Sequence, residues 1–231
     1  MTAAPPELQT VDASLDARAI AEFGAEHVLL ATGSYWVTDG RGRSNYDPLP
    51  GFGGSTLTPD DLLDGHPVEG PVVIYDDDHY YMANALAAQL ASQGHQVHIV
   101  TPLPTLSGWM GYTLEQARMV GELHGLGVKM YPNCTATAWT GHGLEIIRSD
   151  TGDHLPIVEA KTLVSVTLRQ PIAELSSVLE NMDINHRIIG DAEAPGTIQS
   201  AVYSGHRHAR EILGNEAEDG IFKRERPTLF L

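Results

Sequence analysis

Several kinds of residue are scarce in this sequence, and each shortage excludes a class of protein. The single cysteine, Cys134, rules out a framework of internal disulfide bonds, and alone it cannot hold an iron–sulfur cluster or a structural zinc ion. Basic residues are also few: 14 Lys and Arg stand against 30 Asp and Glu, a net charge of −16. Because nucleic acids and anionic membranes both select a basic surface, we expect neither as a partner.

Long apolar runs are missing as well. No stretch approaches the roughly 20 apolar residues that a membrane-spanning helix needs. Residues 1–10 lack the basic and apolar regions of a signal peptide. The sequence therefore predicts a cytoplasmic protein, and its 231 residues suffice for one large domain or two small ones.

The most informative shortage is of glycine at one turn. Residues 72–74 form an apolar run typical of a buried parallel strand, residues 82–92 an Ala- and Leu-rich helix, and residues 95–100 a second strand. In a dinucleotide-binding βαβ unit the first turn carries glycines, which let the backbone approach the pyrophosphate. Here the turn at 75–78 reads Tyr-Asp-Asp-Asp, and three carboxylates repel phosphate. We therefore expect no NAD(P)H binding by this unit.

The remaining patterns predict an α/β fold of two domains. Helices are expected over 14–23, ended by Gly24, and over 114–126 and 197–213, with an irregular loop over 39–55. Strand patterns follow at 27–31, 128–131, 136–140, 144–149, 162–166 and 188–189. Residues 66–169 are assigned to one domain, which interrupts a second domain made of residues 1–65 and 170–231.

Two short motifs end apolar strands on either side of the glycine-poor unit. The first is Ala31-Thr32-Gly33 and the second is Gly190-Asp191. Each motif alone is equally well explained by an ordinary tight turn. Their order is more informative, because glycine allows close approach of a ligand and a carboxylate accepts hydrogen bonds from a ribityl or ribose hydroxyl. These five residues are the candidate cofactor-binding site.

A longer set of motifs points to a known family. The most distinctive are Gly-Asp-Ala-Glu-Ala-Pro at 190–195, Gly-His-Arg at 205–207, Ala-Thr-Gly-Ser-Tyr-Trp at 31–36 and Asp-Pro-Leu-Pro-Gly at 47–51. Together they resemble the C-terminal third of trimethylamine and dimethylamine dehydrogenases, relatives of the dienoyl-CoA reductases, over about residues 14–226. The resemblance implies a Rossmann-like, glutathione-reductase-like fold. In it a degenerate NAD(P)H-binding-like domain is inserted in a partial FAD/ADP-binding domain.

The resemblance also implies partners and cofactors. In the resembled family a flavin barrel with a [4Fe–4S] cluster precedes two nucleotide-fold domains, one holding ADP or FAD. The sequence shows no barrel, no cluster cysteines and no Gly-x-Gly-x-x-Gly unit, and it reads Val166-Thr167-Leu168-Arg169 where relatives end a strand in Thr-Gly. We therefore expect a small non-catalytic subunit of a flavin-dependent amine dehydrogenase. The expected partners are a larger subunit with the barrel, FMN, [4Fe–4S] and the missing glycine-rich unit, and an electron-transfer flavoprotein.

Whether FAD or ADP lies at the subunit interface stays open, and so do two other functions. A free-standing degenerate Rossmann module could bind a protein or a non-nucleotide ligand; independent catalysis is least favoured, since no nucleophile–base pair is visible. Asp76-Asp77-Asp78 lacks the spacing of an EF-hand, so a solvated turn or a helix N-terminus is expected. No metal-ligand spacing involves the histidines, for which surface or loop roles are expected: His79, His95, His98, His124, His142 and His154.

Overall fold

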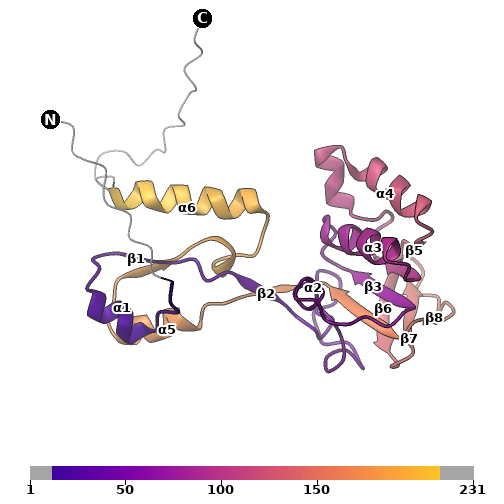
Figure 1. Cartoon of the computed structure of the whole chain (residues 1–231), viewed down its shortest axis with the longest axis horizontal. Helices are drawn as coiled ribbons and strands as arrows, with labels where there is room; N and C mark the ends of the chain where they lie inside the picture. Colours follow the sequence, from indigo (N-terminus) through magenta and orange to yellow (C-terminus); the bar gives the residue numbers. More distant parts are fainter. Residues whose placement is uncertain (1–11, 214–231) are drawn as a thin grey trace, which may run out of the picture. The chain divides into compact units, whose positions relative to one another are not determined.

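The computed structural model describes residues 12–213, and the chain forms two compact units (Figure 1). Unit 2 is Tyr35–Gln170, and it interrupts unit 1, which consists of Met1–Ser34 and Pro171–Leu231. The chain thus enters unit 2 at Tyr35 and not at the expected 65/66, because the loop that follows packs there: Leu49 and Phe52 contact a core cluster of unit 2. Which nucleotide fold each unit represents stays a prediction.

Unit 2 is built around a parallel sheet of four strands. These are β3 (Val72–Asp76), β4 (Val97–Val100), β5 (Lys129–Tyr131) and β9 (Thr162–Val166), in the order β5-β4-β3-β9. Ile74 on β3 lies opposite Ile99 on β4 and Val164 on β9. All residues of β3 and β9 are buried, as in strands covered on both faces.

Helices cover one face of this sheet, and a second sheet covers the other. Successive side chains of a strand point to opposite faces. Val72 and Ile74 accordingly pack with α3 (Met82–Ser92) and α4 (Gln116–Gly125), whereas Val73 and Tyr75 pack against an antiparallel sheet. That second sheet consists of β6 (Cys134–Trp139), β7 (Gly143–Arg148) and β8 (Val158–Glu159), and its core includes the buried Cys134.

Short elements complete unit 2. The helix α2 (Pro59–Leu63) begins at a capping box, in which the Thr58 and Asp61 side chains each bond the other residue's backbone N–H. A 3₁₀ helix, η1 (Gly108–Thr113), precedes α4. The expected irregular loop over 39–55 contains no helix or strand. Strands β2 (Ser34–Trp36) and β10 (Arg169–Pro171) pair where the chain enters and leaves this unit.

Unit 1 has a smaller framework. Its strands β1 (Val28–Leu30) and β11 (His186–Ile188) form a two-stranded parallel sheet, with Leu30 opposite Ile188. Its core joins this sheet to α1 (Ala17–Phe23) and α5 (Glu174–Asn181) through the buried Ala17, Leu30 and Leu179. A short 3₁₀ turn, η2 (Gly190–Ala192), and the helix α6 (Ile198–Leu213) follow β11.

The α/β class predicted from the sequence is confirmed by these elements. The finer prediction, a Rossmann-like domain inserted in a partial FAD/ADP-binding domain, stays a prediction. Among the helices of residues 12–213, none is long and apolar enough to cross a bilayer.

Candidate functional site

The two predicted motifs lie side by side in unit 1. Because β1 and β11 are parallel neighbours, their carboxyl ends reach the same edge of the sheet, and the Ile189 N–H donates to the Leu30 carbonyl at 2.9 Å. Ala31-Thr32-Gly33 follows one strand and Gly190-Asp191 follows the other. Ser34 Oγ donates to the Asp191 carboxylate at 3.3 Å, which joins the two turns. The structure thus brings all five candidate residues to one edge.

The turn at Gly33 is open beside its backbone. Gly33 has a φ of 81°, a left-handed conformation that favours glycine, and no atom lies within 4 Å of the place a Cβ would take. Thr32 Oγ1 donates to the Ile172 carbonyl, and the Ile172 N–H donates to the Gly33 carbonyl at 3.0 Å. Ala31 and Thr32 are exposed. The backbone is held in place with space beside it, which fits close approach of a ligand.

Gly190 and Asp191 differ in what they contact. The Gly190 N–H donates to Ser204 Oγ of α6 at 3.1 Å, and Gly190 has a φ of 62°, a left-handed conformation that favours glycine. The half-buried Asp191 carboxylate accepts from the Gly196 N–H at 3.1 Å and from Ser34. Each carboxylate oxygen has two lone pairs, so a carboxylate such as that of Asp191 accepts several hydrogen bonds at once. Gly190 is explained by the fold alone, whereas Asp191 also fits a ligand.

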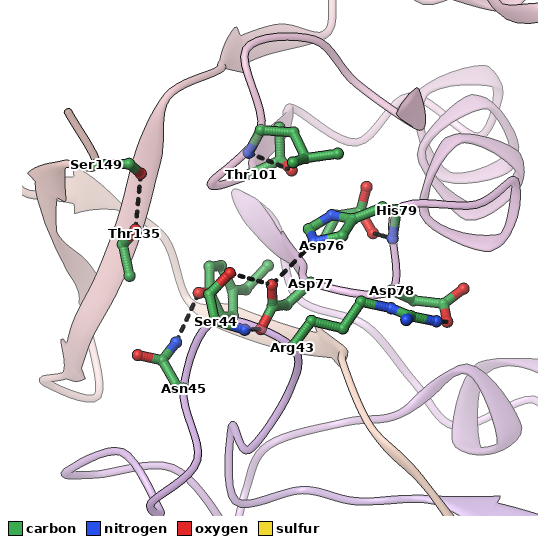
Figure 2. Close-up of polar contacts among 12 residues, drawn as sticks. Arg43, Ser44, Asn45, Asp76, Asp77, Asp78, His79, Thr101, Thr135 and Ser149 are labelled. Carbon is green, nitrogen blue, oxygen red and sulfur yellow. Dashed lines mark hydrogen bonds and ion pairs between the residues drawn. The ribbon is translucent and has the colours of Figure 1, made fainter. Parts of the chain in front are cut away.

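Two of the three carboxylates of the glycine-poor turn in unit 2, those of Asp76 and Asp77, are buried, and Figure 2 shows their polar contacts. Asp76 and Asp77 are each 0% exposed, so the expectation of a solvated turn is wrong for these two residues. Asp77 accepts hydrogen bonds from Ser44 N–H and Oγ, both at 2.7 Å, and lies 3.1 Å from His79 Nε2. These donors explain how Asp77 can be buried, because each replaces contact with water.

A segment from the preceding loop covers the end of β3, as Figure 2 shows. Beside the Ser44 contacts, Asn45 Nδ2 donates to the Tyr75 hydroxyl at 2.8 Å, and the Arg43 guanidinium lies 3.9 Å from the Asp78 carboxylate. A Cβ on Gly42 would overlap the Asp77 carboxylate, so only glycine fits there. We call residues 42–45 the covering segment.

Burial changes the acid–base properties of this turn. Loss of contact with water raises the pKa of Asp76 from 3.8 to about 7, although the His79 N–H donates to its Oδ1 at 3.0 Å. Burial also raises the pKa of Asp78, an effect that the nearby Arg169 and Arg43 oppose. The turn therefore holds a carboxyl group that gains or loses its proton near neutral pH.

Sequence reasoning missed the histidines of unit 2. His79 is 4% exposed and adopts a φ of 69° between its contacts with Asp76 and Asp77, and His98 is 5% exposed and stacks on Tyr131. Surface or loop roles were expected for these two residues. His79 lies in a loop, although it is buried, whereas the expectation is wrong for His98, a buried residue of β4 (Val97–Val100). The partners of His79 are two and three residues away, a spacing that no motif marks. Within the described part of the chain, no cluster of three or more His, Cys, Asp or Glu could hold a metal ion.

Residues 57–153 match the family model of the OYE-like second alpha/beta domain. The chain is also 33% identical over 224 residues to dimethylamine dehydrogenase of Hyphomicrobium sp. (strain x). That match covers 84% of this chain and 30% of the relative.

Two solved structures are also similar to this chain in sequence and in fold. Histamine dehydrogenase from Rhizobium sp. 4-9 is 36% identical with a TM-score of 0.85, over 93% of this chain and 35% of that one. A 6-hydroxypseudooxynicotine amine oxidase from Pseudomonas geniculata N1 is 32% identical with a TM-score of 0.82, over 85% and 30%. The chain therefore spans about a third of the length of the relatives it matches. It is homologous to dimethylamine dehydrogenase and histamine dehydrogenase over that part of their length.

Proposed function

We propose that this chain is a small non-catalytic subunit of a flavin-dependent amine dehydrogenase, in which it completes an ADP or FAD site. The homology to dimethylamine and histamine dehydrogenases supports the reaction class. The observation that carries the proposal is the shared edge of unit 1, where β1 and β11 bring Ala31-Thr32-Gly33 and Gly190-Asp191 together. Amines are oxidised elsewhere in the assembly.

The nucleotide lies along that edge. The open backbone at Gly33 allows its close approach, and when the nucleotide is FAD, Asp191 accepts a hydrogen bond from a ribityl hydroxyl. The sequence has no Gly-x-Gly-x-x-Gly motif, so the pyrophosphate is held by a glycine-rich loop on the partner. FAD, when bound, accepts and passes on electrons, whereas ADP has no redox group.

The partner is a larger subunit with the flavin barrel, FMN and the [4Fe–4S] cluster. The two-stranded parallel sheet is a physical reason to expect such a partner. Parallel sheets are stable when they contain more than two strands and when both of their faces are covered. Within residues 12–213, β1 has a strand on one side only. We propose that a strand of the larger subunit pairs with its other edge.

Unit 2 does not bind NAD(P)H in this proposal. The buried carboxylates of Asp76 and Asp77 stand where a glycine turn would admit phosphate, and the covering segment lies over them. Electrons then leave through a separate protein, for which an electron-transfer flavoprotein is the proposed acceptor.

Nucleotide release from the native assembly tests the function. Mass spectrometry after denaturation should find FAD or ADP, and its absence would reject the proposal. Asp191→Ala should lower FAD retention but change ADP retention little, because ADP has no ribityl chain. Asp12→Ala, which removes an exposed carboxylate of the described residues, is the matched control and should leave retention unchanged.

A free-standing binding module is the second candidate. It is favoured by unit 2, whose central sheet is covered on both faces by its own elements. The whole chain, expressed alone, separates the two readings: a soluble, colourless, cooperatively folded monomer supports the module. Aggregation that is relieved by coexpression with a flavin-barrel subunit supports the small subunit.

A further inference from the structure

Five buried side-chain atoms around the β3–α3 turn have no hydrogen-bond partner within the described residues. They are Asp76 Oδ2, His79 Nδ1, Ser107 Oγ and both amide atoms of Asn84. The exposed fraction is 4% for His79 and 0% for the other three residues. Folded proteins pair nearly all of their buried polar atoms with protein or ordered water. Five such atoms in one region therefore indicate that a bound molecule supplies their hydrogen bonds.

The four residues belong to segments that meet at the carboxyl end of β3. Asp76 is the last residue of β3, and its carboxylate accepts the His79 N–H, as Figure 2 shows. The Trp109 N–H donates to the His79 carbonyl at 3.1 Å, which brings the segment after Ser107 to the same turn. Asn84 lies in the first turn of α3, which begins three residues after His79.

The groups present donors and acceptors together. Asn84 Oδ1 is an acceptor, Asp76 Oδ2 is an acceptor when the carboxyl is ionised, Asn84 Nδ2 is a donor, and Ser107 and His79 can act as either. Tyr81, the N-cap of the 11-residue helix α3, makes no side-chain cap bond, so this helix start adds backbone donors. A bare cation would pair only with the acceptors and leave the donors unpaired. An anion would be repelled by the Asp76 carboxylate. Water both donates and accepts.

We propose that ordered water binds permanently at this turn and bridges Asp76 to Asn84 and Ser107. Internal waters in proteins make about two to four hydrogen bonds, a number that these groups supply. The site is independent of the nucleotide proposed for unit 1. It gives the turn a hydrated polar centre in the place where a glycine turn would hold phosphate.

A crystal structure of the native assembly, at a resolution that shows ordered water, tests the site. We expect a peak within roughly 2.7–3.2 Å of Asp76 Oδ2 and of Asn84 or Ser107. Asn84→Leu keeps a similar shape without polar atoms and should remove the bridging peak. Gln89→Leu makes a matched change on the exposed side of α3 and should leave it. A dry site, or a peak at the roughly 2.3–2.6 Å of a bound cation, overturns the proposal.

A second measurement applies if Asn84→Leu does not fold. Ser107→Ala removes one hydroxyl, and carboxyl NMR of labelled Asp76 follows its protonation. Because a water that donates to Oδ2 favours the carboxylate, losing it should raise the pKa of Asp76 in Ser107→Ala but not in Gln89→Leu. Equal Asp76 titration in the wild type and both variants overturns the proposal.

Discussion

Unit 2 and unit 1 both contain parallel strands, but they cover them to different degrees. In unit 2 two core clusters of 14 and 11 buried residues lie on the two faces of a four-stranded sheet. The described part of unit 1 has two parallel strands and a core cluster of three buried residues. Phe23 is 73% exposed and Ile198 of α6 is 78% exposed. Unit 2 therefore has the interior of a complete domain, whereas unit 1 has surfaces that further elements normally cover.

The turns at the carboxyl ends of the strands differ as well: the turn in unit 1 is open, and the turn in unit 2 is covered. In unit 1 the turn after β1 is exposed and has open space beside Gly33. In unit 2 the turn after β3 is covered by residues 42–45 and closed by hydrogen bonds to Asp77. A ligand can therefore approach the strand ends of unit 1, whereas the chain itself occupies the corresponding place in unit 2.

Separating the units is the most severe test of this difference. The fragment Tyr35–Gln170 should fold alone with a cooperative thermal transition, because both faces of its sheet are covered by its own residues. Residues 1–34 linked to 171–231 should show no such transition. Circular dichroism during heating measures both. A fragment 35–170 that melts without cooperativity would contradict the comparison.

The closure of the unit 2 turn predicts a large effect of Asp77→Ala. This change leaves the Ser44 N–H and His79 without their buried acceptor, which should lower the free energy of unfolding by about 3–5 kcal/mol. Urea unfolding of the whole chain measures the loss. Asp64→Ala removes an exposed carboxylate of the same unit and should change stability by less than about 0.5 kcal/mol. Equal effects of the two changes would argue that residues 42–45 are not held by Asp77.

Asp76 predicts a pH dependence of unit 2. Its pKa is about 7 in the folded chain against an ordinary 3.8. As the pH rises, the unfolded state therefore loses this proton at a lower pH than the folded state does. Its contribution to stability is thus fully present below pH 3.8 and is lost as the pH rises to about 7. The wild type should lose stability relative to Asp76→Asn over this window, by at most about 1.4 kcal/mol per pH unit. Urea unfolding at a series of pH values measures this difference, and parallel curves would refute the assignment.

Two glycines give the smallest and most finely matched contrast. Gly42→Ala places a methyl group against the Asp77 carboxylate and should cost about 1–3 kcal/mol of stability. Gly121 lies exposed in α4 with no atom within 4 Å of an added Cβ, so Gly121→Ala should stabilise by about 0.5–1 kcal/mol. Thermal unfolding of both variants checks the opposite signs, and a neutral Gly42→Ala would show that residues 42–45 can move away.

Elements with local signals were predicted well from the sequence. The helix over 82–92 and the strand over 162–166 were predicted with the bounds that the structure has, because an Ala- and Leu-rich run and a β-branched run are read within one window. α2 was not predicted, although Thr58, Pro59 and Asp61 form a recognisable helix start. α5 was also missed, and no side-chain cap marks its beginning.

The candidate sites show where local reasoning fails. The adjacency of Gly33 and Asp191 followed from motifs at the ends of two strands, and the structure brings them together; nucleotide binding there stays a prediction. The burial of Asp77 could not be predicted, because Ser44 lies 33 residues earlier in a loop with no regular structure. Three successive carboxylates in a sequence are typical of a solvated turn, and only the structure shows that residues 42–45 cover this one.

The lone thiol of the chain gives the molecule a built-in chemical reporter. Cys134 is 4% exposed in β6, its Sγ–H donates to the Pro132 carbonyl at 3.3 Å, and burial raises its pKa. Because the thiolate is the reactive form, the native thiol reacts slowly with alkylating reagents. With no other cysteine in the sequence, the alkylation rate reports the opening of one place, the second sheet of unit 2. A thiol reagent therefore follows the opening of unit 2 alone, and unit 1, which contains no cysteine, adds no signal of its own.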